Sequence, residues 1–227
     1  MAWSDEIGAN GFAIRHDVLS ADWIGQVLED DIRRFHLRSK AGLRHAMALG
    51  SVRFISCCDP IRRLACEVLG SRAYPFRATI FDKSSSTNWL VAWHQDTALP
   101  LRHRMDVAGW SAWSVKQGIS YAHAPASVMS QVLAMRIHLD DSTSENGPLR
   151  VLPGTHNLGL LTDERIHELS ERTMPVECIA SRGGVVAMRP LLVHASSKSH
   201  AEIPRRVLHI EYAASQDITS PLELEVA

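Results

Sequence analysis

The chain lacks several features that mark particular classes of protein. No apolar run in its 227 residues reaches the ~18 residues that a membrane-spanning helix needs. Basic residues are not in excess, since 24 Lys and Arg face 25 Asp and Glu, which disfavours a general nucleic-acid-binding protein. Internal repeats and low-complexity tracts are also absent. What remains is a globular composition with 45% hydrophobic and 22% charged residues.

Cysteine is scarce and has no paired spacing. Cys57, Cys58, Cys66 and Cys178 form no CxxC motif, which is typical of reduced thiols. The first residues, MAWSDEIGAN, are acidic where a signal peptide is basic, and no long apolar core follows. We therefore expect a cytoplasmic protein that does not associate with membranes.

The apolar pattern predicts a few helices and many short strands. We expect helices over 20–38, 60–69 and 163–171, the first capped by Ser20. Gly, Pro and Asn separate β-rich runs that predict strands near 75–82, 90–94, 131–139, 148–152, 175–180, 184–188, 190–195 and 205–213. The segment VRFIS at 52–56 also has a strand-like composition. Many short strands with few helices favour a sandwich or a barrel.

We expect one domain over residues 1–227. Residues 1–72 are mostly helical support in this interpretation, and residues 73–215 form the β core. The stretch 97–130 has weak periodicity and predicts a long loop, and such loops often cover a site. Trp110 and Trp113 in this stretch would wall a substrate pocket or, alternatively, plug the end of the core.

The segment Trp93-His94-Gln95-Asp96 carries the strongest chemical signal. It ends a predicted strand, and residues i and i+2 of a strand point to the same side, so His94 and Asp96 can face one point. His194 ends another apolar run. Two histidines and one carboxylate on one face of a metal ion leave positions open, as in non-haem Fe(II) oxygenases. On spacing alone, solvated or core histidines remain an alternative.

Two other pairs have the same spacing. They are His138 with Asp140 and His209 with Glu211, and spacing does not exclude the first. The context of His194 favours His94 and Asp96, because Ser196 and Arg205 follow it. An arginine on an adjacent strand can form a forked pair with the carboxylate of a co-substrate.

Four segments resemble the phytanoyl-CoA dioxygenase family of Fe(II)- and 2-oxoglutarate-dependent oxygenases. They are WHQD at 93–96, NGPLRVLPGTH at 146–156, VHASS at 193–197 and PRRVLHIEY at 204–212. The resemblance implies a mainly β fold, a double-stranded β-helix or cupin-like jelly-roll barrel with N-terminal helices packed outside. It also implies a dioxygenase that uses Fe(II), 2-oxoglutarate and O₂ to hydroxylate a small organic metabolite, with succinate and CO₂ as co-products.

The resemblance also assigns roles to residues of this chain. His94, Asp96 and His194 would hold the iron and serve catalysis, and the presence of Asp96 disfavours halogenation. Arg205 would pair with the distal carboxylate of 2-oxoglutarate, since Arg206 points the other way in a regular strand. The remaining cofactor contacts would come from Ser196, Lys83 and Gln95, and Gln95 has a supporting role as its alternative.

Arg136 departs from the family pattern, because some relatives have a tryptophan there. His138 has the same strand parity, so both would face the barrel interior. A buried arginine needs a partner. Arg136 and His138 are therefore expected to contact substrate or, for Arg136, 2-oxoglutarate, with an internal salt bridge as the alternative.

Two other functions remain open at this point. One is a cupin-like metal enzyme that does not use 2-oxoglutarate, and the other is a non-catalytic binding barrel. The substitution Arg205→Ala separates the first from our interpretation, because it weakens 2-oxoglutarate binding only if that molecule is used. A binding barrel would release no succinate with any substrate. The oligomeric state is not predicted.

Overall fold

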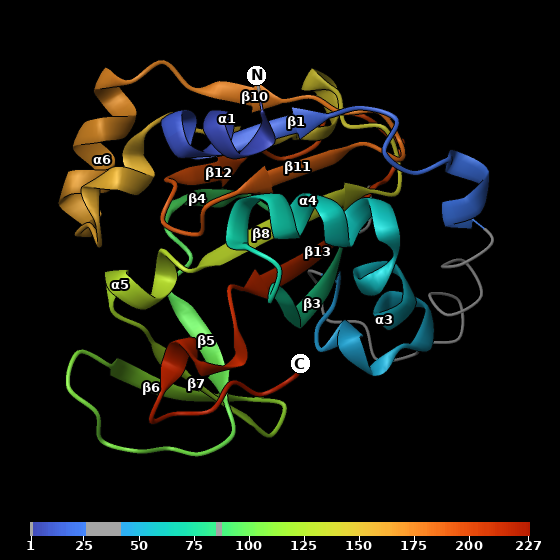
Figure 1. The fold of residues 1–227 in the computed structure, drawn as a ribbon. Helices are drawn as coiled ribbons and strands as arrows, with labels where there is room; N and C mark the ends of the chain where they lie inside the picture. Colours follow the sequence, from blue (N-terminus) through green and yellow to red (C-terminus); the bar gives the residue numbers. More distant parts are fainter. Residues whose placement is uncertain (1, 26–41, 85–87) are drawn as a thin grey trace.

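The computed structural model describes residues 2–25, 42–84 and 88–227, whose strands form three antiparallel sheets (Figure 1). The six-stranded sheet has the order β1 (Phe12–Arg15), β11 (Val185–Met188), β8 (Val132–His138), β13 (Arg205–Ala213), β3 (Tyr74–Lys83) and β2 (Gly42–Leu43). The four-stranded sheet has the order β10 (Val176–Cys178), β9 (Leu149–Val151), β12 (His194–Ser196) and β4 (Val91–His94). The three-stranded sheet consists of β5 (Ala98–Leu101), β7 (Ile119–His123) and β6 (Ser111–Lys116).

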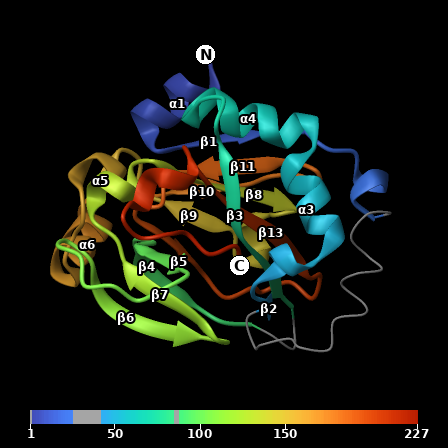
Figure 2. The same cartoon turned by 60° about the horizontal axis from the view of Figure 1, so that its bottom comes forward.

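Helices cover one face of the six-stranded sheet. These are α1 (Trp3–Asn10), α3 (Gly50–Cys57) and α4 (Asp59–Leu69), and α1 and α4 lie side by side in Figures 1 and 2. The other helical segments are short: η1 (Ala46–Ala48), α5 (Ala126–Met129), η2 (Ser144–Asn146), η3 (Thr155–Leu158), α6 (Asp163–Arg172) and η4 (Gln216–Thr219). No helix among the described residues is long and apolar enough to cross a bilayer.

The core forms on both faces of the six-stranded sheet. Ile7, Ile55 and Ile61 of the helices share one buried cluster with Leu208 and Ile210 of β13. A separate buried cluster joins the large sheet to the four-stranded sheet through Ala134, Val186, Met188, Leu149, Val151 and Cys178. The two sheets therefore pack face to face, and the mainly β architecture predicted from the sequence is confirmed.

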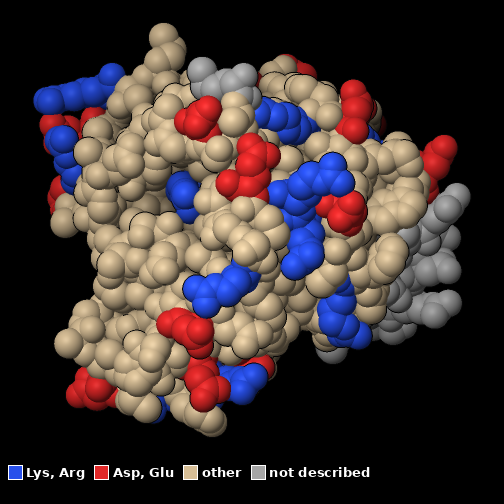
Figure 3. Space-filling view, in the orientation of Figure 1, with Lys and Arg blue, Asp and Glu red and all other residues tan. Residues whose placement is uncertain are grey.

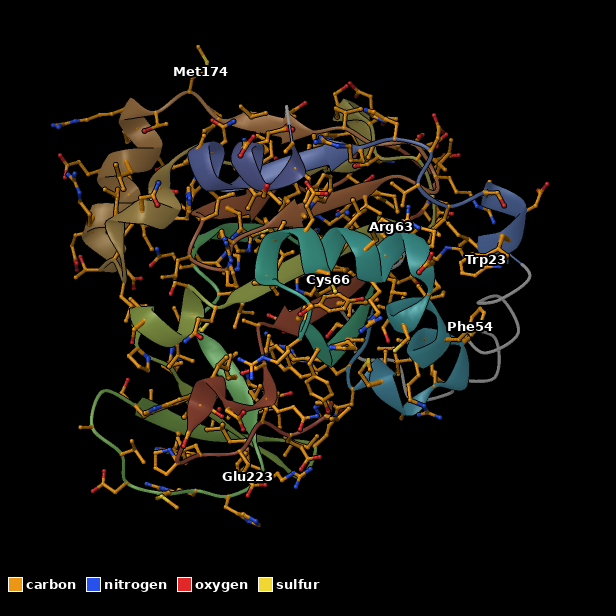
Figure 4. All side chains as sticks on the ribbon, viewed as in Figure 1. Trp23, Phe54, Arg63, Cys66, Met174 and Glu223 are labelled. Atoms are coloured by element: carbon orange, nitrogen blue, oxygen red, sulfur yellow. The ribbon has the colours of Figure 1, made fainter. Side chains whose placement is uncertain are left out.

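The predicted helices are largely found. Thr162 caps α6 by accepting a hydrogen bond from the Arg165 N–H, and the 60–69 prediction corresponds to α4. Residues 21–25 are helical, and the Ser20 hydroxyl accepts from the Trp23 N–H. The rest of the 20–38 prediction lies outside the described residues. Trp23 faces Phe54 of α3, with ring centroids 5.9 Å apart (Figure 4).

Three local predictions were wrong. VRFIS belongs to α3, where Val52 and Ile55, three residues apart, are fully buried on one helical face. The stretch 97–130 is mostly ordered, since it forms the three-stranded sheet and α5. The run 190–195 becomes a strand only at His194, because a turn closes from Arg189 to Leu192.

The N-terminal part supplies strands as well as helices. β1 and β2, both unpredicted, form the two edges of the six-stranded sheet. The division into a helical support and a β core therefore does not separate two units of structure. On the face shown in Figure 3, basic and acidic side chains are interspersed and form no continuous basic area.

Candidate metal centre

Three ligand-type side chains meet where β4 and β12 run side by side. His94 ends β4, and its register partner on β12 is His194. Asp96 lies two residues after His94, and its N–H donates to the Pro190 carbonyl over 2.9 Å. Within the described ranges these three residues form the group that can hold a metal ion, with their ligand atoms all within 4.8 Å of one another.

Backbone hydrogen bonds orient both imidazoles. Nδ1 of His94 donates to the Ala92 carbonyl over 2.8 Å, and Nδ1 of His194 donates to the Leu192 carbonyl over 2.8 Å. Because the proton is on Nδ1, the Nε2 lone pair is free for a metal. The two Nε2 atoms lie 3.7 Å and 3.5 Å from the carboxylate oxygens of Asp96. This geometry fits a 2-His-1-carboxylate metal centre.

The electrostatics of these groups favour the forms that bind metal. Burial lowers the pKa of His94, and the neighbouring His194 lowers it further. Burial raises the pKa of Asp96, but the two histidines outweigh it and hold that pKa well below its usual range. At neutral pH the centre therefore presents a neutral imidazole and a carboxylate, which are the ligating forms.

A cavity of about 140 Å³ opens on this centre, and we call it the inner cavity. Two guanidinium groups and one hydroxyl line it together with the three ligand-type residues. They belong to Arg136, Arg205 and Ser196, and apolar lining comes from Phe81, Trp89, Val91 and Leu149. The cavity is thus a partly apolar chamber with positive charge beside a metal centre.

Neither guanidinium in the inner cavity has a described counter-ion. Arg205 is 3% exposed and donates through Nε to the Asn146 carbonyl, while its Nη1 has no hydrogen-bond partner among the described residues. Nη1 of Arg136 lies 3.2 Å from Nδ1 of His209, and its Nε likewise has no described partner. Burial, and then Arg136, lowers the pKa of Arg205 to about 9. Two buried like charges of this kind suit a bound dicarboxylate.

Lys83 is a third basic residue beside them. It is buried, and its Nζ donates to the Ser196 hydroxyl over 2.7 Å and to the Ser197 carbonyl. Burial lowers its pKa to about 7, and Arg205 and Arg136 contribute. The Asn-Gly-Pro turn packs tightly here, since Gly147 has φ +66° and a Cβ on it would lie 2.4 Å from the Ser197 carbonyl oxygen.

Gln95 points away from the metal centre. Its amide nitrogen donates to the carbonyls of Gly159 and Leu191, and its oxygen accepts from the Leu161 N–H. These three bonds occupy the side chain and tie β4 to neighbouring loops. These bonds favour the supporting role that was the alternative to a cofactor contact.

The predicted substrate residues divide. Arg136 lines the inner cavity. His138 is buried with no described partner for either ring nitrogen, it does not line the cavity, and burial lowers its pKa to about 3. Trp110 and Trp113 pack in a cluster with Leu101 and Ala122 of the three-stranded sheet and do not line the inner cavity. This packing favours the core alternative for these two tryptophans.

The two competing pairs have other partners. Asp140 forms a forked ion pair with Arg206, which leaves His138 alone. Glu211 is fully buried in a forked ion pair with Arg77, and His209 lies 4.0 Å from it. The sequence indicated His209 and Glu211 only as a competing ligand pair, without Arg77 as the partner of Glu211. Strand parity could have found this cluster, because His209 and Glu211 share the parity of Arg205 on β13.

A jelly roll that carries two histidines and an aspartate at adjoining strand ends defines a class of metal-binding barrels. The family described as phytanoyl-CoA dioxygenase (PhyH) matches residues 8–207. The chain belongs to this family, and the resemblance found in the sequence is confirmed.

A curated relative and two solved structures are similar to this chain. L-proline trans-4-hydroxylase of Streptomyces griseoviridis is 30% identical over 176 residues, which cover 66% of this chain and 58% of the relative. AviO1 from Streptomyces viridochromogenes Tue57 has a TM-score of 0.67 and 23% identity, with 93% of each chain covered. EctD from S. alaskensis, solved with 2-oxoglutarate and 5-hydroxyectoine, has a TM-score of 0.71 and 17% identity, covering 94% of this chain and 75% of EctD. These two likenesses confirm the fold.

Proposed function

We propose that this protein is an Fe(II)- and 2-oxoglutarate-dependent dioxygenase that hydroxylates a small organic molecule. His94, Asp96 and His194 hold the iron in this proposal. The chemistry supplied at such a centre is the coupled oxidation of 2-oxoglutarate and of a substrate C–H bond by O₂, with succinate and CO₂ released. The named activity of the L-proline hydroxylase relative supports this reaction type.

The observation that carries the proposal is the pair of buried guanidiniums without a counter-ion beside the metal centre. Arg205 forms a forked pair with the distal carboxylate of 2-oxoglutarate, and the Ser196 hydroxyl donates to the same group. Lys83 holds Ser196 in place through the hydrogen bond from its Nζ. Arg136 supplies a second cation from β8, the strand paired with β13, so the dianion is oriented before the reaction.

Other roles follow from the surroundings of the site. The apolar side chains of Phe81, Val91 and Leu149 exclude water from the inner cavity and strengthen its charge interactions. We further propose that the chain acts as one domain, in the cytoplasm, where free thiols are stable. The four cysteines are all free, which agrees with that location.

An anaerobic titration tests the proposal. Apo-protein receives Fe(II) and then 2-oxoglutarate, and the weak visible charge-transfer band of a chelated keto acid is followed. We expect a band that saturates at one equivalent, that His94→Ala abolishes and that His167→Ala, an exposed histidine on α6, leaves intact. Iron binding without a band would favour a cupin-like enzyme that does not use 2-oxoglutarate. Failure of both to bind would favour a non-catalytic barrel.

A further inference from the structure

A second cavity of about 170 Å³ adjoins the metal centre. It shares Asp96, Phe81 and His209 with the inner cavity, so a molecule bound in it borders the metal centre. We call it the outer cavity. Its other charged and aromatic lining residues are Arg44, His45, Arg77, Lys116 and Tyr121.

One wall of the outer cavity is a fixed hydrogen-bonded array. The Tyr121 hydroxyl lies 3.1 Å from Nε2 of His45, and the two rings stack with centroids 6.3 Å apart. Arg77 lies against the Tyr121 ring and is held by Glu211 and by the Ala98 carbonyl. The charge of Arg77 is thus already neutralised within the protein.

Arg44 and Lys116 differ from Arg77, because neither has an ion pair with any described residue. Exposed arginines of the chain differ in this respect, since Arg63 and Arg102 pair with Asp59 and Glu223 whereas Arg62 has no described ion pair. The carboxylate that lines the outer cavity belongs to Asp96, which is one of the three candidate metal ligands. The cavity therefore carries two positive charges that nothing described neutralises.

The backbone next to Arg44 and Lys116 has a restricted conformation. Lys116 ends β6 immediately before the Gln117-Gly118 turn, whose φ values of 50° and 85° give a tight hairpin. Arg44 directly follows β2, where Gly42 lies so close to β3 that a Cβ on it would be 2.0 Å from the Ile80 carbonyl oxygen. Lys116 is close enough to Arg44 and Arg77 for both to lower its pKa, after the larger effect of burial. Arg44, Arg77 and Lys116 therefore all line the outer cavity.

We propose that the substrate is a small anion whose carboxylate or phosphate group binds between Arg44 and Lys116 in the outer cavity. This inference rests on the proposed function. An oxyanion there accepts a forked pair from the guanidinium and a hydrogen bond from the ammonium group. The uncharged part of the molecule then lies along Phe81 and Tyr121 and reaches the metal centre beside Asp96.

The test is a substrate panel in matched pairs. Amino acids are compared with their primary amides, and phosphomonoesters with the corresponding alcohols. The readout is succinate released above the substrate-free background, with Fe(II), 2-oxoglutarate and O₂ present. We expect stimulation by the charged member of a pair and little by the neutral member. The amino-acid arm and the phosphomonoester arm distinguish a carboxylate substrate from a phosphate substrate.

Variants locate the effect. Arg44→Gln and Lys116→Gln are each expected to raise KM for the charged substrate about ten- to hundredfold, the range for losing one charge-assisted hydrogen bond. They leave the KM for 2-oxoglutarate and the charge-transfer band unchanged. Arg102→Gln, an exposed arginine outside both cavities, is the matched control and leaves all these values unchanged.

The outcomes separate the two proposals. If no charge-transfer band forms, the proposed function itself fails and the substrate inference falls with it. If the band forms but neutral members stimulate as well as charged ones, or no charged compound stimulates, the substrate class is wrong and the dioxygenase proposal stands. Unchanged KM values in both Gln variants also overturn the anion site.

Discussion

The two faces of the six-stranded sheet use the same strands for opposite purposes. On β13, Leu208, Ile210 and Tyr212 point toward the helices and belong to a cluster that is apolar throughout. The alternate residues Arg205, His209 and Glu211 point into the barrel, where all three are buried. One strand therefore carries the main hydrophobic core and the polar site within nine residues.

The difference shows how the fold tolerates a costly site. Burial of unpaired cations such as Arg205 and Arg136 is unfavourable in the free protein, because burial lowers the pKa of both. The helix-covered face compensates by removing large apolar side chains from water. Stability is thus concentrated on the outer face, and binding capacity on the inner face.

The largest expected effect breaks this division. Glu211 lies on the inner face but serves the structure, because it neutralises Arg77. Glu211→Ala leaves a buried guanidinium without its partner and is expected to cost about 3–5 kcal/mol of unfolding free energy. Urea denaturation measures it, with the exposed Glu171→Ala as control. A loss no larger than that of the control would show that the ion pair is not a stabilising element.

A core truncation on the outer face gives the next effect. Leu208 is fully buried against the helices, so Leu208→Ala is expected to lose about 2–5 kcal/mol through the cavity it creates. The Kd for 2-oxoglutarate is expected to stay within about twofold, a difference of less than 0.5 kcal/mol. A large change in Kd with little change in stability would contradict the separation of the two faces.

Arg205→Leu reverses that pattern. The Kd for 2-oxoglutarate is expected to rise about a hundredfold, equivalent to about 2.7 kcal/mol, since a forked charged pair is lost. The melting temperature of the apo-protein stays the same or rises, because an uncompensated buried charge is removed. Arg206→Leu is the matched control: it loses the Asp140 pair but keeps 2-oxoglutarate binding. Equal Kd values for 2-oxoglutarate in the two variants would show that Arg205 does not bind it.

The last expected effect is a pH dependence of stability. Lys83 has a pKa of about 7 in the folded protein and a normal one of 10.5 when unfolded. Between these values the unfolded chain binds more protons, so the stability of the apo-protein gains a contribution as pH rises from about 7 to about 10.5. Lys83→Met is expected to lack that contribution. Parallel stability–pH curves for the two proteins in denaturant titrations would contradict the assignment.

Local spacing predicted part of the arrangement of the candidate site. The i, i+2 spacing predicted that His94 and Asp96 lie close together, although Asp96 follows the end of β4, and the strand period predicted that Arg205 and Arg206 point to different sides. Turn chemistry and capping predicted α4 and α6. These features depend on neighbours in the chain, which a sequence displays directly.

The outer cavity was not predictable in the same way. Arg44 follows β2 of the six-stranded sheet, whereas Lys116 and Tyr121 belong to the β6–β7 hairpin of the three-stranded sheet, so only the tertiary structure brings them to one cavity. The 97–130 stretch showed no clear period because its strands are short and several side chains of β6 face solvent. VRFIS failed for a related reason, since β-branched residues at helical spacing resemble a strand in composition.

The register of β4 and β12 has a consequence for thermal stability. His94 and His194 are direct partners across the strands although they are far apart in the chain. An ion held by both binds the folded chain in preference to the unfolded one, because folding brings the two histidines together. The resistance of this protein to heat therefore varies with free metal concentration, by mass action. Its melting temperature would report how much of a preparation is loaded.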